Sequence, residues 1–203
     1  MELTAWVSLA SICLMGAMTP GPSLAVVLKH TISGGRSHGL MTAMAHAIGM
    51  ALYATLSIVG LAVLIQQSPV LFDLIRYVSV AFLLYLAYKA LTSNSALAKL
   101  DEQTNTVTMK QSFIEGVMIT FVNPKLAIFF VALFSQFIQP DAGWIQNVVM
   151  VSTAAGIDSL WYCFIAVVLS QSSMLSKLRN NSHIIEKITG VALILVAARV
   201  VLT

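Results

Sequence analysis

Two long stretches of this chain contain no Asp, Glu, Lys or Arg: residues 3–28 and residues 39–72. A helix that crosses the hydrocarbon layer of a membrane needs about 20 predominantly apolar residues. Further apolar runs cover approximately residues 74–92, 113–138, 143–171 and 184–203. Because only 9% of the residues are charged, against about 25% in ordinary soluble domains, the chain has too few charges for a water-exposed surface. We therefore predict an all-α, polytopic membrane protein with six transmembrane helices.

The basic residues are distributed unevenly between the connections that join the expected spans. The connections after the first, third and fifth spans carry Lys29, Arg36, Lys89, Lys99, Lys110, Lys177, Arg179 and Lys187, whereas the other side carries Arg76 and Arg199. Lysine and arginine near span ends favour the cytoplasmic side. The first span follows an acidic residue, Glu2, and is too long for a signal-peptide core. We expect it to be retained, with both termini on the outer side of the membrane.

The chain divides into two halves of three spans each. One sizeable polar segment, residues 93–112, separates a first half, about residues 1–92, from a second half, about residues 113–203. The halves echo each other weakly, since "PSLAVVL" from Pro22 aligns with "PKLAIFF" from Pro124. With three spans per half, the second half must cross the membrane in the opposite sense. We therefore expect a single transporter domain built from two inverted three-helix repeats, the architecture of many secondary transporters.

Proline interrupts the first span of each half. The residues of the two breaks are Thr19, Pro20, Gly21 and Pro22 in "GAMTPGPSLAVV", and Asn123 and Pro124 in "FVNPK". Because proline lacks an amide hydrogen, the carbonyls of Gly16, Met18 and Thr120 are expected to lose their helical partners. In a membrane, such carbonyls are tolerated only inside the protein or beside a water-filled cavity. Interrupted spans at matching positions point to a substrate site; the alternative is a pair of packing kinks.

Two ionisable residues lie near the middle of expected spans, where a charge is costly unless it is paired or hydrated. Lys125 directly follows the second break, and Asp158 lies in the fifth span within "GIDSLWY". We expect an ion pair that a zwitterionic substrate opens, its carboxylate binding Lys125 and its ammonium binding Asp158. The alternative is a buried salt bridge that fixes helix register. Thr19, Ser23 and Asn123 either bind the substrate carboxylate or satisfy the freed backbone groups.

A histidine in the second span, His46, is a second candidate for proton coupling beside Asp158. Imidazole titrates near physiological pH, so His46 suits a proton relay; a hydrogen bond between two helices is the alternative. Ionisable residues near span ends are expected to be structural: Asp73, Arg76, Glu115 and Arg199. The sequence contains no HExxH, GxSxG, Walker or paired-cysteine motif. We therefore expect no enzymatic activity, no cofactor and no metal site, and transport that draws on an ion or substrate gradient.

In these motifs the chain resembles the LysE/RhtB family of bacterial amino-acid exporters. The motifs are "GAMTPGP", "GGRSHGL", "FVNPK", "GIDSLWY" and "ITGVALILVAARVVL", and the resemblance covers essentially the whole chain. It implies proton-coupled efflux of amino acids or close derivatives across the bacterial inner membrane. It also implies that the two broken helices meet around the substrate path, which assigns substrate binding to Thr19, Pro20, Gly21, Pro22, Asn123, Pro124 and Lys125, and less directly to Asp158. Ser79 departs from the glycine that is usual there, which affects only local packing.

Two other functions stay open at this stage. Efflux of a divalent metal or another small solute would suit the same architecture, although the spans lack the clustered cysteines, histidines or carboxylates that bind such metals. A membrane assembly protein without transport activity would tolerate a neutral pair in place of Lys125 and Asp158. Small residues in the second span, Ala43, Ala47 and Gly49, permit close helix packing and a homodimer. No nucleic-acid partner is expected.

Overall fold

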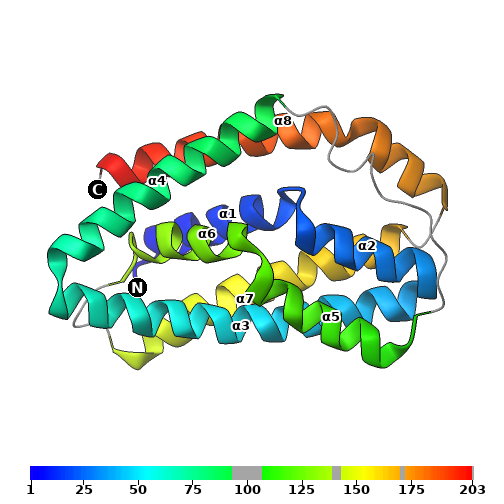
Figure 1. Cartoon of the computed structure of the whole chain (residues 1–203), viewed down its shortest axis with the longest axis horizontal. Helices are drawn as coiled ribbons and strands as arrows, with labels where there is room; N and C mark the ends of the chain where they lie inside the picture. Colours follow the sequence, from blue (N-terminus) through cyan, green and yellow to red (C-terminus); the bar gives the residue numbers. More distant parts are fainter. Residues whose placement is uncertain (93–106, 139–142, 170–171, 203) are drawn as a thin grey trace.

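The computed structural model describes residues 1–92, 107–138, 143–169 and 172–202, and every regular element within these ranges is an α-helix. The helices are α1 (Leu3–Met18), α2 (Pro22–Gly34), α3 (Arg36–Gln67), α4 (Pro69–Thr92), α5 (Met109–Val122), α6 (Pro124–Phe134), α7 (Trp144–Leu169) and α8 (Ser172–Leu202) (Figure 1). The expected all-α class is confirmed. Most of the expected linker, residues 93–106, lies outside the described residues. Its last residues belong to α5, which begins after a capping box formed by Thr108 and Gln111.

Three helices, α3, α4 and α7, are each long and apolar enough to cross a membrane. Two pairs reach this length together and are bent sharply at their breaks, α1–α2 by 57° and α5–α6 by 59°. The described residues thus hold up to five spans by length and composition, and the chain is a polytopic membrane protein. The sixth expected span lies in α8, which is not among these five. The total of six therefore stays a prediction.

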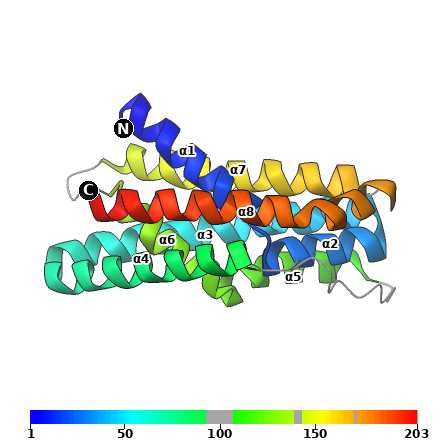
Figure 2. The same ribbon diagram turned by 90° about the horizontal axis from the view of Figure 1, so that it is seen from above.

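The two bent pairs run in opposite directions. In Figure 1, α1 and α2 lead away from the end where both termini lie, whereas α5 and α6 lead back toward it. The helix α3 packs against α5 and α7, α4 packs along α8, α2 contacts α5, and α1 contacts α6. In Figure 2, the long helices α3, α4, α7 and α8 lie roughly parallel or antiparallel to one another. Each helix of the first half thus contacts its expected counterpart in the second half; the inverted repeat itself stays a prediction.

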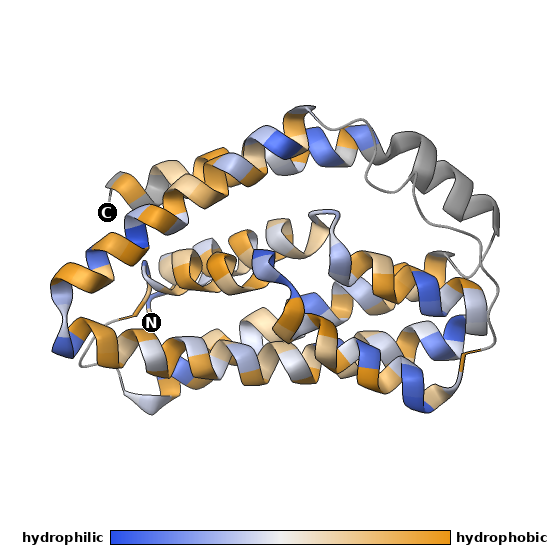
Figure 3. Cartoon of the chain, viewed as in Figure 1, coloured by the Kyte–Doolittle hydropathy of each residue, from blue (hydrophilic) through white to orange (hydrophobic). Residues whose placement is uncertain are grey.

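Apolar side chains fill the interior and also cover the outer surface. Phe130 and Phe134 of α6 and Leu83 of α4 are completely buried. Large apolar residues such as Leu56 of α3 and Leu160 of α7 are exposed. Figure 3 shows hydrophobic colouring on every helix outside the grey segments, with a hydrophilic interruption where α5 meets α6. Because apolar surface of this extent marks contact with an apolar partner, the outer face suits lipid.

Close packing between α3 and α5 depends on Gly116. A methyl group added there would lie 2.6 Å from the carbonyl oxygen of Thr42 and 2.9 Å from Cβ of Ala45, both in α3. Because this steric clash is relieved only when α3 shifts, we expect Gly116→Ala to lower the free energy of unfolding by about 1–3 kcal/mol. Gly60→Ala is the control, since nothing lies within 4 Å of its added methyl group. Thermal unfolding in detergent measures both variants, and equal midpoints would contradict this packing.

Candidate substrate site at the two helix breaks

The first break is stabilised by its own hydrogen bonds. The N–H of Thr19 is shared between the carbonyls of Met15 at 3.1 Å and Gly16 at 3.3 Å. The Thr19 hydroxyl also donates to the Met15 carbonyl at 2.8 Å. Pro22 is the first residue of α2, where the missing N–H of proline costs nothing. The expectation that Gly16 loses its partner to Pro20 is therefore wrong, because the last turn of α1 tightens and Thr19 replaces the missing donor.

The second break is organised by one buried side chain, Asn123. Its Oδ1 accepts a hydrogen bond from the backbone N–H of Lys125 at 3.1 Å, which caps the start of α6. Its Nδ2 donates to the hydroxyl of Ser23 in α2 at 3.0 Å. Both Asn123 and Ser23 are 2% exposed. A single amide thus begins α6 and ties the second break to the first.

Lys125 completes the junction between the breaks. Its Nζ donates to the carbonyl oxygen of Thr19 at 3.1 Å. A methyl group added at Gly21 would lie 3.2 Å from the same Nζ. The absence of a side chain at Gly21 therefore leaves space for the lysine to reach the Thr19 carbonyl. The expected meeting of the two breaks is therefore observed. What these residues bind stays a prediction.

The acidic group expected beside Lys125 is paired with histidine instead. Nδ1 of His46 in α3 lies 2.6 Å from Oδ2 of Asp158 in α7. His46 is fully buried and Asp158 is 3% exposed. Nε2 of His46 is buried and has no partner among the described residues. The expected direct ion pair between Lys125 and Asp158 is not formed, because Asp158 faces α3 and Lys125 faces the Thr19 carbonyl.

Two hollows meet at the breaks. A groove of about 510 Å³ is lined by both breaks, by Tyr85 of α4 and by Glu186 of α8. A narrow cavity of about 20 Å³, enough for a single water molecule, is lined by Asp158 and Lys125. Thr19 and Lys125 line both hollows. Leu86 also lines both, so the hydrogen bond between Thr19 and Lys125 lies beside the groove and beside the cavity lined by Asp158.

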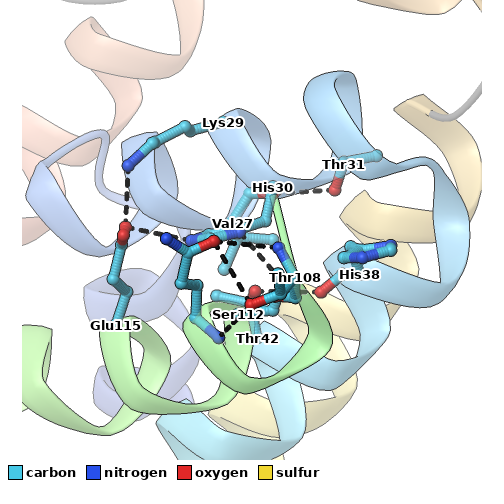
Figure 4. A network of polar contacts seen from close by, with 10 residues as sticks. Val27, Lys29, His30, Thr31, His38, Thr42, Thr108, Ser112 and Glu115 are labelled. Atoms are coloured by element: carbon cyan, nitrogen blue, oxygen red, sulfur yellow. Dashed lines mark hydrogen bonds and ion pairs between the residues drawn. The ribbon is translucent and has the colours of Figure 1, made fainter. Parts of the chain in front are cut away.

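A second polar cluster ties α2 to α5 and is missing from the sequence-based site (Figure 4). Glu115 Oε2 lies 2.8 Å from Lys29 Nζ and 3.0 Å from His30 Nε2. His30, fully buried, also contacts the hydroxyl of Ser112 through Nδ1 at 3.0 Å. The sequence feature that indicates this cluster is the pair of opposite charges on Lys29 and Glu115. Both residues are expected near the cytoplasmic ends of their spans. Contact between α2 and α5 brings them together.

The fold and the junction define a class of protein: a polytopic helical membrane protein with two opposed broken helices that meet at a half-buried lysine. The model of the LysE type translocator family matches residues 14–203, and the chain belongs to this family. The chain is therefore a membrane translocator.

Named relatives align with most of the chain. The membrane protein YrhP of Bacillus subtilis (strain 168) is 27% identical over 202 residues, covering 95% of this chain and 95% of the relative. The leucine efflux protein of Salmonella typhimurium (strain LT2) is 29% identical over 152 residues, covering 75% of this chain and 71% of the relative. The leucine efflux protein of Salmonella typhi has the same identity and coverage. No solved structure matches the chain.

Proposed function

We propose that this chain exports amino acids with apolar side chains, leucine foremost, from the cytoplasm across the bacterial inner membrane in exchange for protons. The observation that carries the proposal is the junction of two broken helices around Lys125. Family membership and the names of the leucine efflux relatives support the substrate class. The basic residues near the end of α2 and the start of α3 favour the cytoplasm for that end, with both termini outside.

Lys125 provides the binding partner for the substrate carboxylate. Its ammonium contacts a neutral carbonyl oxygen, that of Thr19, and lines the groove. A carboxylate carries a full charge and accepts a stronger hydrogen bond than a neutral carbonyl does. The substrate therefore replaces Thr19 as the partner of Lys125. This exchange opens the contact between Lys125 and Thr19, which both line the groove and the cavity.

Asp158 couples export to protons by binding one cation at a time. Its carboxylate is paired with His46 and lines the cavity next to Lys125. A substrate ammonium and a proton both bind to the ionised form of the Asp158 carboxylate, so they compete for it. A proton on the Asp158–His46 pair thus weakens ammonium binding, and a bound ammonium opposes protonation by the same factor. Mutual exclusion of this kind is what exchange of an amino acid for a proton requires.

The groove favours an apolar side chain. Its walls include Ala25 of α2 and Phe82, Tyr85 and Leu86 of α4, with Lys89 and Glu186 as charged residues of the lining. Its volume of about 510 Å³ falls in the range of roughly 300–1,000 Å³ that is typical of small-molecule sites. A leucine side chain against these walls leaves the charged ends of the amino acid near the breaks. We therefore place leucine ahead of amino acids with charged side chains.

The test uses purified protein in liposomes loaded with radiolabelled leucine, homoserine, lysine or glutamate. We expect leucine to leave fastest, and to leave faster when a proton gradient drives protons into the liposomes. Protein-free liposomes measure leakage. Efflux of all four amino acids at the protein-free rate, with and without the gradient, would reject the proposed function.

A further inference from the structure

Glu186 of α8 is a buried acid that the proposed mechanism does not use. Its side chain is 3% exposed, whereas the next residue, Lys187, is exposed. The helix therefore turns Glu186 inward, where α8 packs along α4 and the carboxylate lines the groove together with Lys125 of α6. A carboxylate in such a place is costly unless cations or hydrogen-bond donors face it. Glu186 thus brings a negative charge to the hollow that is proposed to hold the substrate.

One face of α8 passes both hollows in succession. Glu186 lines the groove, and Leu193, seven residues later, lines the narrow cavity. Seven residues make nearly two turns, so the two side chains lie on the same face of the helix and about 10 Å apart along its axis. The groove therefore lies nearer the start of α8, and the cavity lies further along the same helix.

The charged side chains divide between the two hollows. Glu186 lines only the groove, Asp158 lines only the cavity, and Lys125 lines both. The cavity of about 20 Å³ holds no more than a single water molecule, whereas the groove of about 510 Å³ has the volume of a small-molecule site. A zwitterionic amino acid thus fits the groove, where its carboxylate meets Lys125 and where Glu186 is the acid of the lining.

We propose that Glu186 binds the substrate ammonium in the groove, before the ammonium reaches Asp158. The inference rests on the proposed function. Lys125 holds the carboxylate in both positions, because it lines both hollows. The ammonium passes from Glu186 to Asp158 when the contact between Lys125 and Thr19 opens. With the C-terminus outside, the start of α8 lies toward the cytoplasm, so the groove is the hollow that the exported amino acid enters first. One acid then recognises the substrate, and a second acid couples it to protons.

The test compares leucine with 4-methylpentanoate, which is leucine without its α-amino group. Dissociation constants are obtained from the rise of the thermal unfolding midpoint with ligand concentration in purified protein. We expect the wild type to bind leucine about 30-fold more tightly than 4-methylpentanoate, a factor equivalent to about 2 kcal/mol for a buried charge pair. We expect Glu186→Gln to bind the two compounds within about threefold of each other, because glutamine keeps the shape of the side chain and removes its charge.

The matched control is Asp73→Asn, which removes an exposed acid at the start of α4, outside the groove lining, and should keep the full preference for leucine. Glu186→Asp keeps the charge on a side chain one methylene shorter and should show an intermediate preference. This second variant tests the same site if the glutamine variant does not fold.

Three results would overturn the inference: equal binding of both compounds by the wild type, an unchanged preference for leucine in the Glu186 variants, or a preference that is lost in Asp158→Asn and kept in Glu186→Gln. In each case the proposed function stands if the wild type shows leucine counterflow, the uptake of labelled leucine into liposomes filled with unlabelled leucine. If the wild type transports no leucine, the proposed function fails and the inference falls with it.

Discussion

Replacement of Lys125 by methionine is expected to reduce leucine export about 100-fold. Lys125 is the group that the proposed mechanism assigns to the substrate carboxylate, and its ammonium lies at the junction of both breaks. Removal of one partner from a buried charge pair typically costs about 2–5 kcal/mol, and roughly 3 kcal/mol corresponds to the expected factor. Methionine keeps most of the length of the side chain and its apolar character, so the loss should fall on binding rather than on folding.

The control for this variant is Lys187→Met, which neutralises an exposed lysine of α8. Export rates in liposomes are compared at equal amounts of inserted protein, and thermal unfolding checks that both variants are folded. Export by Lys125→Met at the rate of the control would show that the junction does not bind the substrate.

Replacement of Asp158 by asparagine is expected to abolish the stimulation of export by a proton gradient. Asparagine has the shape of the protonated acid and can still contact His46, but it cannot exchange a proton. Because it also lacks a charge, it no longer attracts the substrate ammonium, and leucine counterflow should fall as well. Asp73→Asn is the matched control, since Asp73 is exposed at the start of α4. Net export is measured with and without the gradient; a variant stimulated as strongly as the control would remove Asp158 from the coupling step.

The breaks were predictable because their signal is local. Proline removes a hydrogen-bond donor wherever it stands, so Pro22 and Pro124 mark the starts of α2 and α6 without knowledge of the fold. Asn123 before Pro124 is likewise a residue type that caps helices. The chain bends by 57° and 59° at these positions, and a hydrogen bond between Asn123 and Ser23 joins the two breaks.

The partner of Asp158 was not predictable in the same way. It depends on which faces of α3 and α7 turn toward each other, and a helix that is apolar all round has no stripe to indicate a face. The chemistry of His46 marks it as a candidate, but nothing in the sequence indicates its contact with a carboxylate more than a hundred residues later. The predicted pairing of Lys125 with Asp158 rests on their similar depth in the membrane. Contact also requires that the two side chains point toward each other, and this depends on the rotation of each helix about its own axis.

Tyr162 and His30 show a second limit of prediction from the sequence. Aromatic residues in apolar spans are usually packing residues, and no local pattern indicates that the ring of Tyr162 lies beside His46. His30 follows Lys29 at the end of the first apolar run, where a polar residue is expected to be hydrated. Packing of α2 against α5 buries it instead and supplies Glu115 and Ser112 as partners.

The most direct measurement compares the stabilisation of the purified protein by leucine and by leucinamide, which differ at the carboxylate that Lys125 is proposed to bind. A ligand that binds only the folded state raises the midpoint of thermal unfolding as its concentration exceeds its dissociation constant. We expect leucine to raise the midpoint of the wild type and of Lys187→Met, but not that of Lys125→Met, and we expect leucinamide to have no effect on any of them. Equal stabilisation of the wild type by leucine and leucinamide, unchanged in Lys125→Met, would show that the junction of the two broken helices is not the carboxylate site.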